Sequence, residues 1–131
     1  MVKSRPLAAI ALCWVIVVRT LLSSSRSIVE LERLLARTAA RLPAVPASDV
    51  HLAAWAVTAA ARRVPGTRCL AWSLALRALL QQMGVASELT IGVAPATAGE
   101  LDAHAWVRCD GQDWSWGGGP VDRYGAFKRR T

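Results

Sequence analysis

Residues 68–76 read RCLAWSLAL, and residues 104–107 read HAWV. The first stretch predicts a helix with Cys69 in its first turn, because Thr67 before it is a suitable N-cap. The second predicts a strand that carries His104. A cysteine attacks as a thiolate, so it needs the positive end of a helix, a nearby cation and a histidine that accepts its proton. These two stretches therefore predict Cys69 as a nucleophile and His104 as its base.

Helical patterns precede the Cys69 helix. Ser27-Ile28-Val29-Glu30 is a capping-box sequence and predicts a helix that reaches about Leu42. Ser48-Asp49 predicts the start of another helix, which reaches about Arg63 and is ended by Pro65-Gly66. We therefore expect a helical layer from the N-terminal half, with the Cys69 helix, ended by Gly84, packed into it.

After Gly84 the apolar spacing changes from a helical period to a period of two. Residues 89–93 alternate between apolar and polar, which predicts a half-buried strand. Residues 104–109 predict a second strand, and Asp110-Gly111 predicts a tight hairpin into residues 112–116. We expect Gly117–Pro120 to end the sheet and the basic tail 128–131 to fray. Helices followed by strands give an α+β fold class with a small antiparallel sheet.

The N-terminal apolar run, residues 7–18, is too short to span a bilayer, which takes about 20 residues. We interpret it as a buried or groove-forming amphipathic helix; a secretory signal and an interfacial anchor are the alternatives. A cytoplasmic location is the expectation. With 131 residues the chain is expected to be a single domain, 1–131, with a helical region over 1–66 and a catalytic core over 67–127.

The formal charge of +7 comes mostly from arginines scattered along predicted helices. This pattern favours a solvated basic surface, with no nucleic-acid partner, although a negatively charged peptide could use it. The chain has three cysteines, Cys13, Cys69 and Cys109, and no CxxC pair. That argues against a disulfide scaffold and a zinc site, so no metal is expected. A Cys69–Cys109 disulfide, or two buried structural thiols, is the alternative.

Several blocks in order resemble the lasso-peptide biosynthesis B2 proteins, which are leader peptidases of the transglutaminase-like superfamily. These blocks are CLxxSLAL from Cys69, Leu79-Leu80 before Gly84, Ile91-Gly92-Val93, and AHAWV from Ala103 followed by Asp110-Gly111. The resemblance covers about residues 67–127. It implies a papain-like fold and cysteine proteolysis of a ribosomally made precursor peptide at its leader, without a metal or organic cofactor. It also implies two partners, a separate leader-recognition protein and an ATP-dependent macrocyclase.

By this resemblance Cys69 attacks the scissile carbonyl, His104 serves as base and then as acid, and the Cys69 amide is an oxyanion donor. The family's acid position is occupied here by Trp116. Asp113 is our prediction for the third catalytic residue, although a tight hairpin turn would pair it opposite Arg108. Asp122 is an alternative, as is a Cys-His dyad in which Ser115 or a backbone carbonyl orients the ring.

Four of the six tryptophans fall around the proposed site, and we expect Trp72, Trp106 and Trp116 to line an aromatic groove for the substrate. Core packing explains most of them equally well. His51 is interpreted as structural. Two other functions compete with the peptidase: an inactive, peptide-binding scaffold, and a membrane-associated structural protein that uses residues 7–18.

Overall fold

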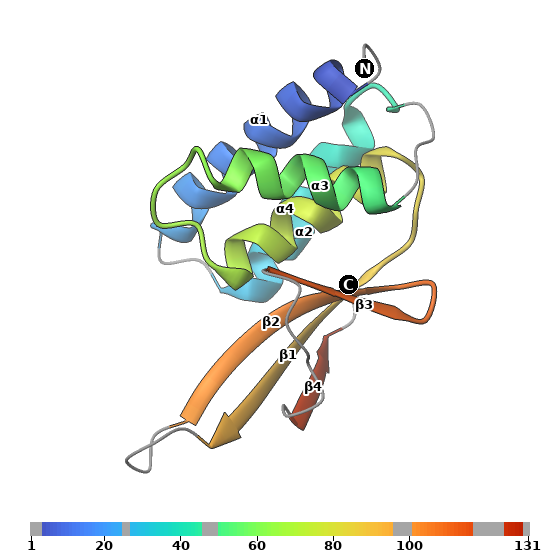
Figure 1. Ribbon diagram of the computed structural model, residues 1–131. Coiled ribbons are helices and arrows are strands. Elements are labelled where there is room, and N and C mark those ends of the chain that lie inside the picture. The colour runs from blue at the N-terminus through green and yellow to red at the C-terminus, as the bar shows by residue number, and fades with distance from the viewer. Residues whose placement is uncertain (1–3, 25–26, 46–49, 96–100, 117–124, 130–131) are drawn as a thin grey trace.

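A layer of helices covers one face of an antiparallel sheet (Figure 1). The structure, a computed structural model, describes residues 4–24, 27–45, 50–95, 101–116 and 125–129. The helices in these ranges are α1 (Ser4–Leu22), α2 (Ile28–Arg41), α3 (Val50–Ala61) and α4 (Cys69–Gln82). The strands are β1 (Glu88–Pro95), β2 (Leu101–Cys109), β3 (Gln112–Ser115) and β4 (Gly125–Arg129). The predicted α+β class is confirmed.

The helices begin and end close to the predicted positions. Ser27 caps α2, and its hydroxyl accepts a hydrogen bond from the Glu30 amide at 3.2 Å. In α1, the apolar residues at three- and four-residue steps are buried: Leu7, Ala11, Trp14, Val15 and Val18. The N-terminal apolar run is therefore a core helix. None of the described helices is long and apolar enough to cross a membrane.

The α4 helix is buried along almost its whole length. Residues 71–76 and 78–80 are all buried, and they pack against α1, α2 and α3 on one side and against β2 and β1 on the other. Because its neighbours enclose it, packing fixes the position of this helix in the fold.

The sheet has the strand order β3-β2-β1-β4. Asp110 and Gly111 both have positive φ, 51° and 75°, as the two-residue hairpin turn requires. The expectation that the sheet ends at residues 117–120, with a frayed tail, is wrong. Residues 125–129 form β4 and pair antiparallel with residues 89–93 of β1. This second partner satisfies the outer backbone groups of β1, which the alternating pattern alone could not show.

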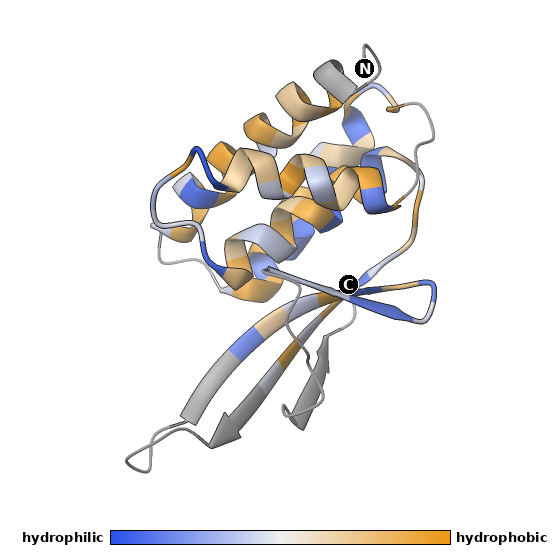
Figure 2. Ribbon diagram, in the orientation of Figure 1, coloured by the Kyte–Doolittle hydropathy of each residue, from blue (hydrophilic) through white to orange (hydrophobic). Residues whose placement is uncertain are grey.

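The two faces of the sheet differ in chemistry. Leu89 and Val107, which are directly opposite each other, are buried in the same core cluster as Leu74 and Leu79 of α4. Ala105 and Cys109 belong to this cluster too, so residues 105, 107 and 109 of β2 face the helices. Figure 2 shows hydrophobic residues throughout the helical layer and a hydrophilic β2–β3 hairpin.

Candidate active site

The N-terminal turn of α4 carries the predicted nucleophile. Cys69 is the first residue of the helix and is half-buried. Thr67 was predicted to be the N-cap of α4, but Arg68 occupies that position. The Thr67 hydroxyl instead donates to the Val64 carbonyl at 2.8 Å. The Thr67 side chain therefore belongs to the preceding turn.

The amide donors at this terminus have no side-chain cap within the described residues. The Trp72 amide donates to the Arg68 carbonyl at 2.9 Å, so the amides of residues 69–71 precede the first helical hydrogen bond. Within the described part of the chain, Arg68 makes no side-chain capping bond to them. A helix N-terminus with free amides attracts negative charge, including a thiolate or an oxyanion.

His104 lies on β2 and is half-buried. Its ring stacks on Trp106 with 5.8 Å between the ring centroids, which confirms that the two share a strand face. The predicted thiol–imidazole pair requires α4 to pack on this face of β2, but α4 packs on the opposite face. Ala105, Val107 and Cys109 face the helix, and by alternation His104 and Trp106 point to the other side.

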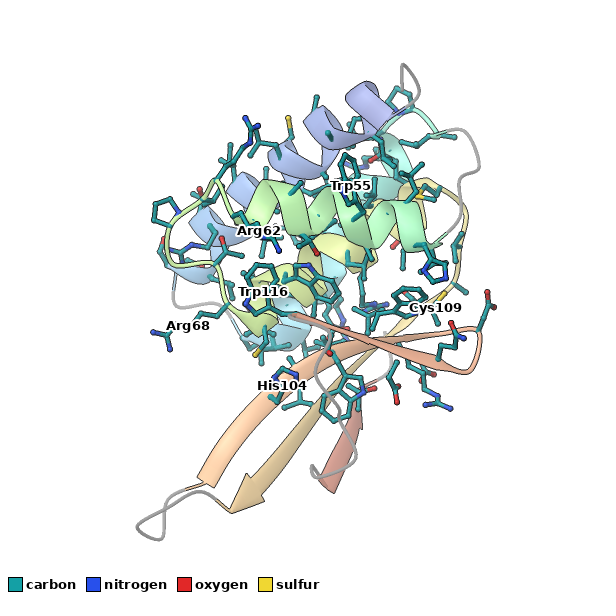
Figure 3. The ribbon with its side chains drawn as sticks, viewed as in Figure 1. Trp55, Arg62, Arg68, His104, Cys109 and Trp116 are labelled. Atoms are coloured by element: carbon teal, nitrogen blue, oxygen red, sulfur yellow. The ribbon has the colours of Figure 1, made fainter. Side chains whose placement is uncertain are left out.

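The described pairing of β3 with β2 stops short of His104. The pairing of β3 with β2 ends at Ser115 opposite Trp106, so no described residue pairs with β2 on that side at residue 104. Trp116 leaves the strand there and contacts Trp72 of α4, with 6.4 Å between the ring centroids. In the view of Figure 3 the labelled side chains of His104, Trp116 and Arg68 are drawn near the N-terminal end of α4.

Asp113 lies farther along the hairpin. It is directly opposite Arg108 in the register, and the two form a salt bridge of 3.0 Å. Arg108 is four residues from His104, about 13 Å along a strand. This geometry does not favour a direct hydrogen bond between the Asp113 carboxylate and the imidazole. The alternative acid, Asp122, lies outside the described residues.

The three predicted groove tryptophans differ in accessibility. Trp72 is 2% exposed and Trp106 is 3% exposed, whereas Trp116 is partly exposed. The Trp72 indole N–H donates to the Thr58 hydroxyl at 3.1 Å. Trp72 and Trp106 are therefore buried, and Trp116 is the one of the three that a peptide reaches most readily.

The other thiols have different environments, and all three cysteines are free. Cys13 is exposed on α1, whereas Cys109 is buried and its thiol contacts the Ala86 carbonyl at 3.5 Å. Burial raises the pKa of the Cys109 thiol, and the negative charge of Asp110 raises it further. Cys109 is therefore a structural thiol, and the proposed Cys69–Cys109 disulfide is not formed. Within the described ranges, no three His, Cys, Asp or Glu side chains converge as metal ligands would.

Sequence reasoning missed two contacts that build this region. The Thr58 partner of Trp72 had no signal in the sequence, because the two residues meet only when α3 packs on α4. His51, for which no partner was predicted, contacts Trp114 edge-on with 4.7 Å between the ring centroids. Its interpretation as a structural residue agrees with this contact.

Comparison with known protein families assigns the chain to a superfamily. Residues 12–129 match the family described as the transglutaminase-like superfamily, which includes cysteine peptidases. Because the match covers most of the chain, the protein belongs to this superfamily. No curated protein and no solved structure matches the chain significantly.

Proposed function

We propose that the protein is a cysteine peptidase that removes the leader from a ribosomally synthesised lasso-peptide precursor. The observation that carries the proposal is the half-buried Cys69 at a helix N-terminus with uncapped amides, in a chain of the transglutaminase-like superfamily. The sequence blocks that resemble the B2 leader peptidases support the choice of substrate. The proposed setting is the cytoplasm, with a separate leader-recognition protein and an ATP-dependent macrocyclase as partners.

In the proposed mechanism His104 takes the proton from the Cys69 thiol, and Sγ attacks the scissile carbonyl carbon. The oxyanion that forms accepts a hydrogen bond from the Cys69 amide. The C–N bond then breaks, the imidazolium gives its proton to the leaving amine, and a thioester remains. Water, deprotonated by His104, attacks the thioester and releases the leader carboxylate and the free thiol. No metal or organic cofactor takes part in these steps.

The transfer between thiol and imidazole requires both groups at the edge of β2. His104 starts from the face opposite α4, at the point where β3 no longer pairs with β2. The proposed transfer therefore requires the imidazole to reach the helix end around this edge of the strand. The orienting group for the ring is one of the candidates named from the sequence, Asp113, Asp122, Ser115 or a backbone carbonyl.

The first experiment measures alkylation of each cysteine by iodoacetamide, with mass spectrometry to locate the modified residue. Exposed Cys13 provides an internal reference in the same molecule. We expect Cys69 to react faster than Cys13 at pH 6.5 although it is less exposed, and the excess rate to disappear in His104→Ala. Cleavage of the precursor peptide, in the presence of its leader-recognition protein, should then be abolished by Cys69→Ala and retained by Cys13→Ala.

A second candidate is an inactive peptide-binding scaffold of the same fold. Two observations favour it: Trp116 occupies the position where the resemblance expects an acid, and Asp113 is held by Arg108. A Cys69 thiol that reacts no faster than Cys13, together with leader binding and an intact leader, would establish this function and exclude the peptidase.

A further inference from the structure

A group of arginines surrounds the connection between α3 and α4. Arg62 and Arg63 directly follow α3, Arg68 directly precedes Cys69, and all three are exposed. Arg19, from the end of α1, donates to the Pro65 carbonyl at 3.3 Å and so brings a fourth guanidinium to this connection. We call these four residues the loop arginines.

No acidic residue is close to the loop arginines in the sequence. Residues 50–87 contain four arginines and no Asp or Glu, and the chain before Glu30 contains no acid either. The two salt bridges among the described residues involve Arg77 and Arg108 instead. Among the described residues none of the loop arginines forms a salt bridge, and like charges that lie together create a positive potential, which an anionic ligand relieves.

The packing of α3 on α4 aligns this patch with the Cys69 turn. The hydrogen bond from Trp72 to Thr58 fixes the two helices side by side. Arg62 follows Thr58 by one helical turn, and Cys69 precedes Trp72 by about one turn, both toward the same connecting loop. In Figure 3 Arg62, Trp116 and His104 lie on the same side of the molecule in this view, and Arg68 projects from the loop.

We propose that the loop arginines bind carboxylates of the substrate peptide beside the scissile bond. Each exposed guanidinium offers a fork of N–H donors that matches a carboxylate. Partly exposed Trp116, which contacts Trp72 of α4, supplies an apolar surface on the same side of the molecule in the view of Figure 3. The arginines and Trp116 together match the chemistry of a short acidic peptide that carries an aromatic side chain. Its identity as the substrate rests on the proposed function of Cys69.

The experiment compares two fluorescein-labelled peptides, one with three Glu and one Phe and its counterpart with Gln at each Glu position. Binding is measured by fluorescence anisotropy at 50 and 300 mM NaCl. The test variant is Arg62→Gln/Arg68→Gln, and the matched control is Arg37→Gln/Arg41→Gln, which removes two exposed arginines from α2. Thermal melts of both variants confirm that they are folded.

We expect the Glu peptide to bind more tightly than the Gln peptide, and we expect its affinity to be lower at 300 mM NaCl than at 50 mM. The test variant should weaken Glu-peptide binding about tenfold, because the binding free energies of two exposed ion pairs are lost together. The control variant should change the affinity little. The bound Glu peptide should also slow alkylation of Cys69 and leave Cys13 unaffected, which locates it beside the thiol.

Equal binding of the two peptides, or equal losses in the test and control variants, would overturn the inference. Protection of Cys13 in place of Cys69 would overturn it too, and so would loop-arginine-dependent binding of duplex DNA without binding of the Glu peptide. A different result would contradict the proposed peptidase function alone. Selective Glu-peptide binding with an unreactive Cys69 would retain the acidic-peptide site and assign it to the inactive scaffold.

Discussion

At the scale of single residues, reactivity depends on the surroundings of each thiol. Cys69 is half-buried at a helix N-terminus, Cys13 is exposed on a helix, and Cys109 is buried against a carbonyl. The residue type is the same in all three positions. What differs is the access of water and the direction of the nearest backbone dipoles, which set the reactivity of a cysteine.

The raised pKa of Cys109 predicts a pH dependence of stability. In the unfolded chain the thiol ionises near its usual pKa of about 8.5, whereas burial keeps the folded thiol neutral to higher pH. The unfolded state therefore loses its proton first, and the free energy of unfolding should fall as the pH rises above about 8.5. We expect Cys109→Ala to show a smaller decline than the parent between pH 7 and pH 10 in urea unfolding. Cys13→Ala should keep the full decline, and an identical decline in Cys109→Ala would contradict the prediction.

At the scale of elements, the two ends of α4 are built differently. Its C-terminus is closed by a Schellman motif, in which the Gly84 amide donates to the Gln81 carbonyl at 3.0 Å and the Val85 amide to the Leu80 carbonyl at 2.8 Å. Its N-terminus has no side-chain cap within the described residues. The stable end anchors the helix, and the open end presents the amides that the proposed chemistry uses.

The Schellman motif predicts the effect of replacing its glycine. Gly84 has a φ of 81°, and a Cβ added there would have no atom within 4 Å among its described neighbours. The cost of Gly84→Ala is therefore backbone strain without a clash, about 1 kcal/mol of unfolding free energy. Chemical denaturation measures it. Gly84→Asn should lose less, because asparagine tolerates the left-handed conformation better; an alanine variant as stable as the parent would refute the assignment of strain.

The β2–β3 hairpin predicts how Asp113 behaves. Its side chain is 28% exposed and that of Arg108 is 44% exposed, so their ion pair is screened by water. We expect Asp113→Asn and Arg108→Gln each to lower the unfolding free energy by less than about 1 kcal/mol. Both should leave the rate of Cys69 alkylation unchanged. If Asp113→Asn alone slowed this alkylation, Asp113 would be the residue that orients His104.

At the scale of the whole molecule, buried polar contacts join segments far apart in the sequence. Glu32 of α2 forms a 2.7 Å salt bridge with Arg77 of α4, and Arg77 also donates to the Ser87 carbonyl before β1. Gln82 of α4 accepts from the Trp14 indole of α1 and donates to the Pro43 carbonyl, both at 2.9 Å. These contacts fix the helices relative to one another and so hold α4 in its position against the sheet.

The Glu32–Arg77 pair predicts a large loss when one partner is removed. The Glu32 side chain is 2% exposed and that of Arg77 is 14% exposed, so Glu32→Leu leaves a buried guanidinium without its carboxylate. We expect this variant to lose about 3 kcal/mol of unfolding free energy. The double variant Glu32→Leu/Arg77→Met should recover part of the loss, because it removes the uncompensated charge. Urea unfolding measures the unfolding free energies of both variants. A double variant less stable than Glu32→Leu would contradict this explanation.

The local patterns of the sequence determined the helices and the first three strands. The Ser27 cap, the positive-φ turn at Asp110-Gly111 and the stop at Gly84 were predictable because each depends on contacts between residues close together in the chain. The same holds for the shared strand face of His104 and Trp106, which follows from the period of a strand.

Tertiary structure alone decided how these elements meet. Which face of β2 packs on α4, the fourth strand, and the pairing of Trp72 with Thr58 all depend on long-range packing. The sequence placed Asp113 opposite Arg108, but only the folded hairpin formed the ion pair that holds its carboxylate. Periodicity specifies that a strand has two faces. It does not specify which neighbour covers each face, because that choice depends on the total surface that all the elements bury together.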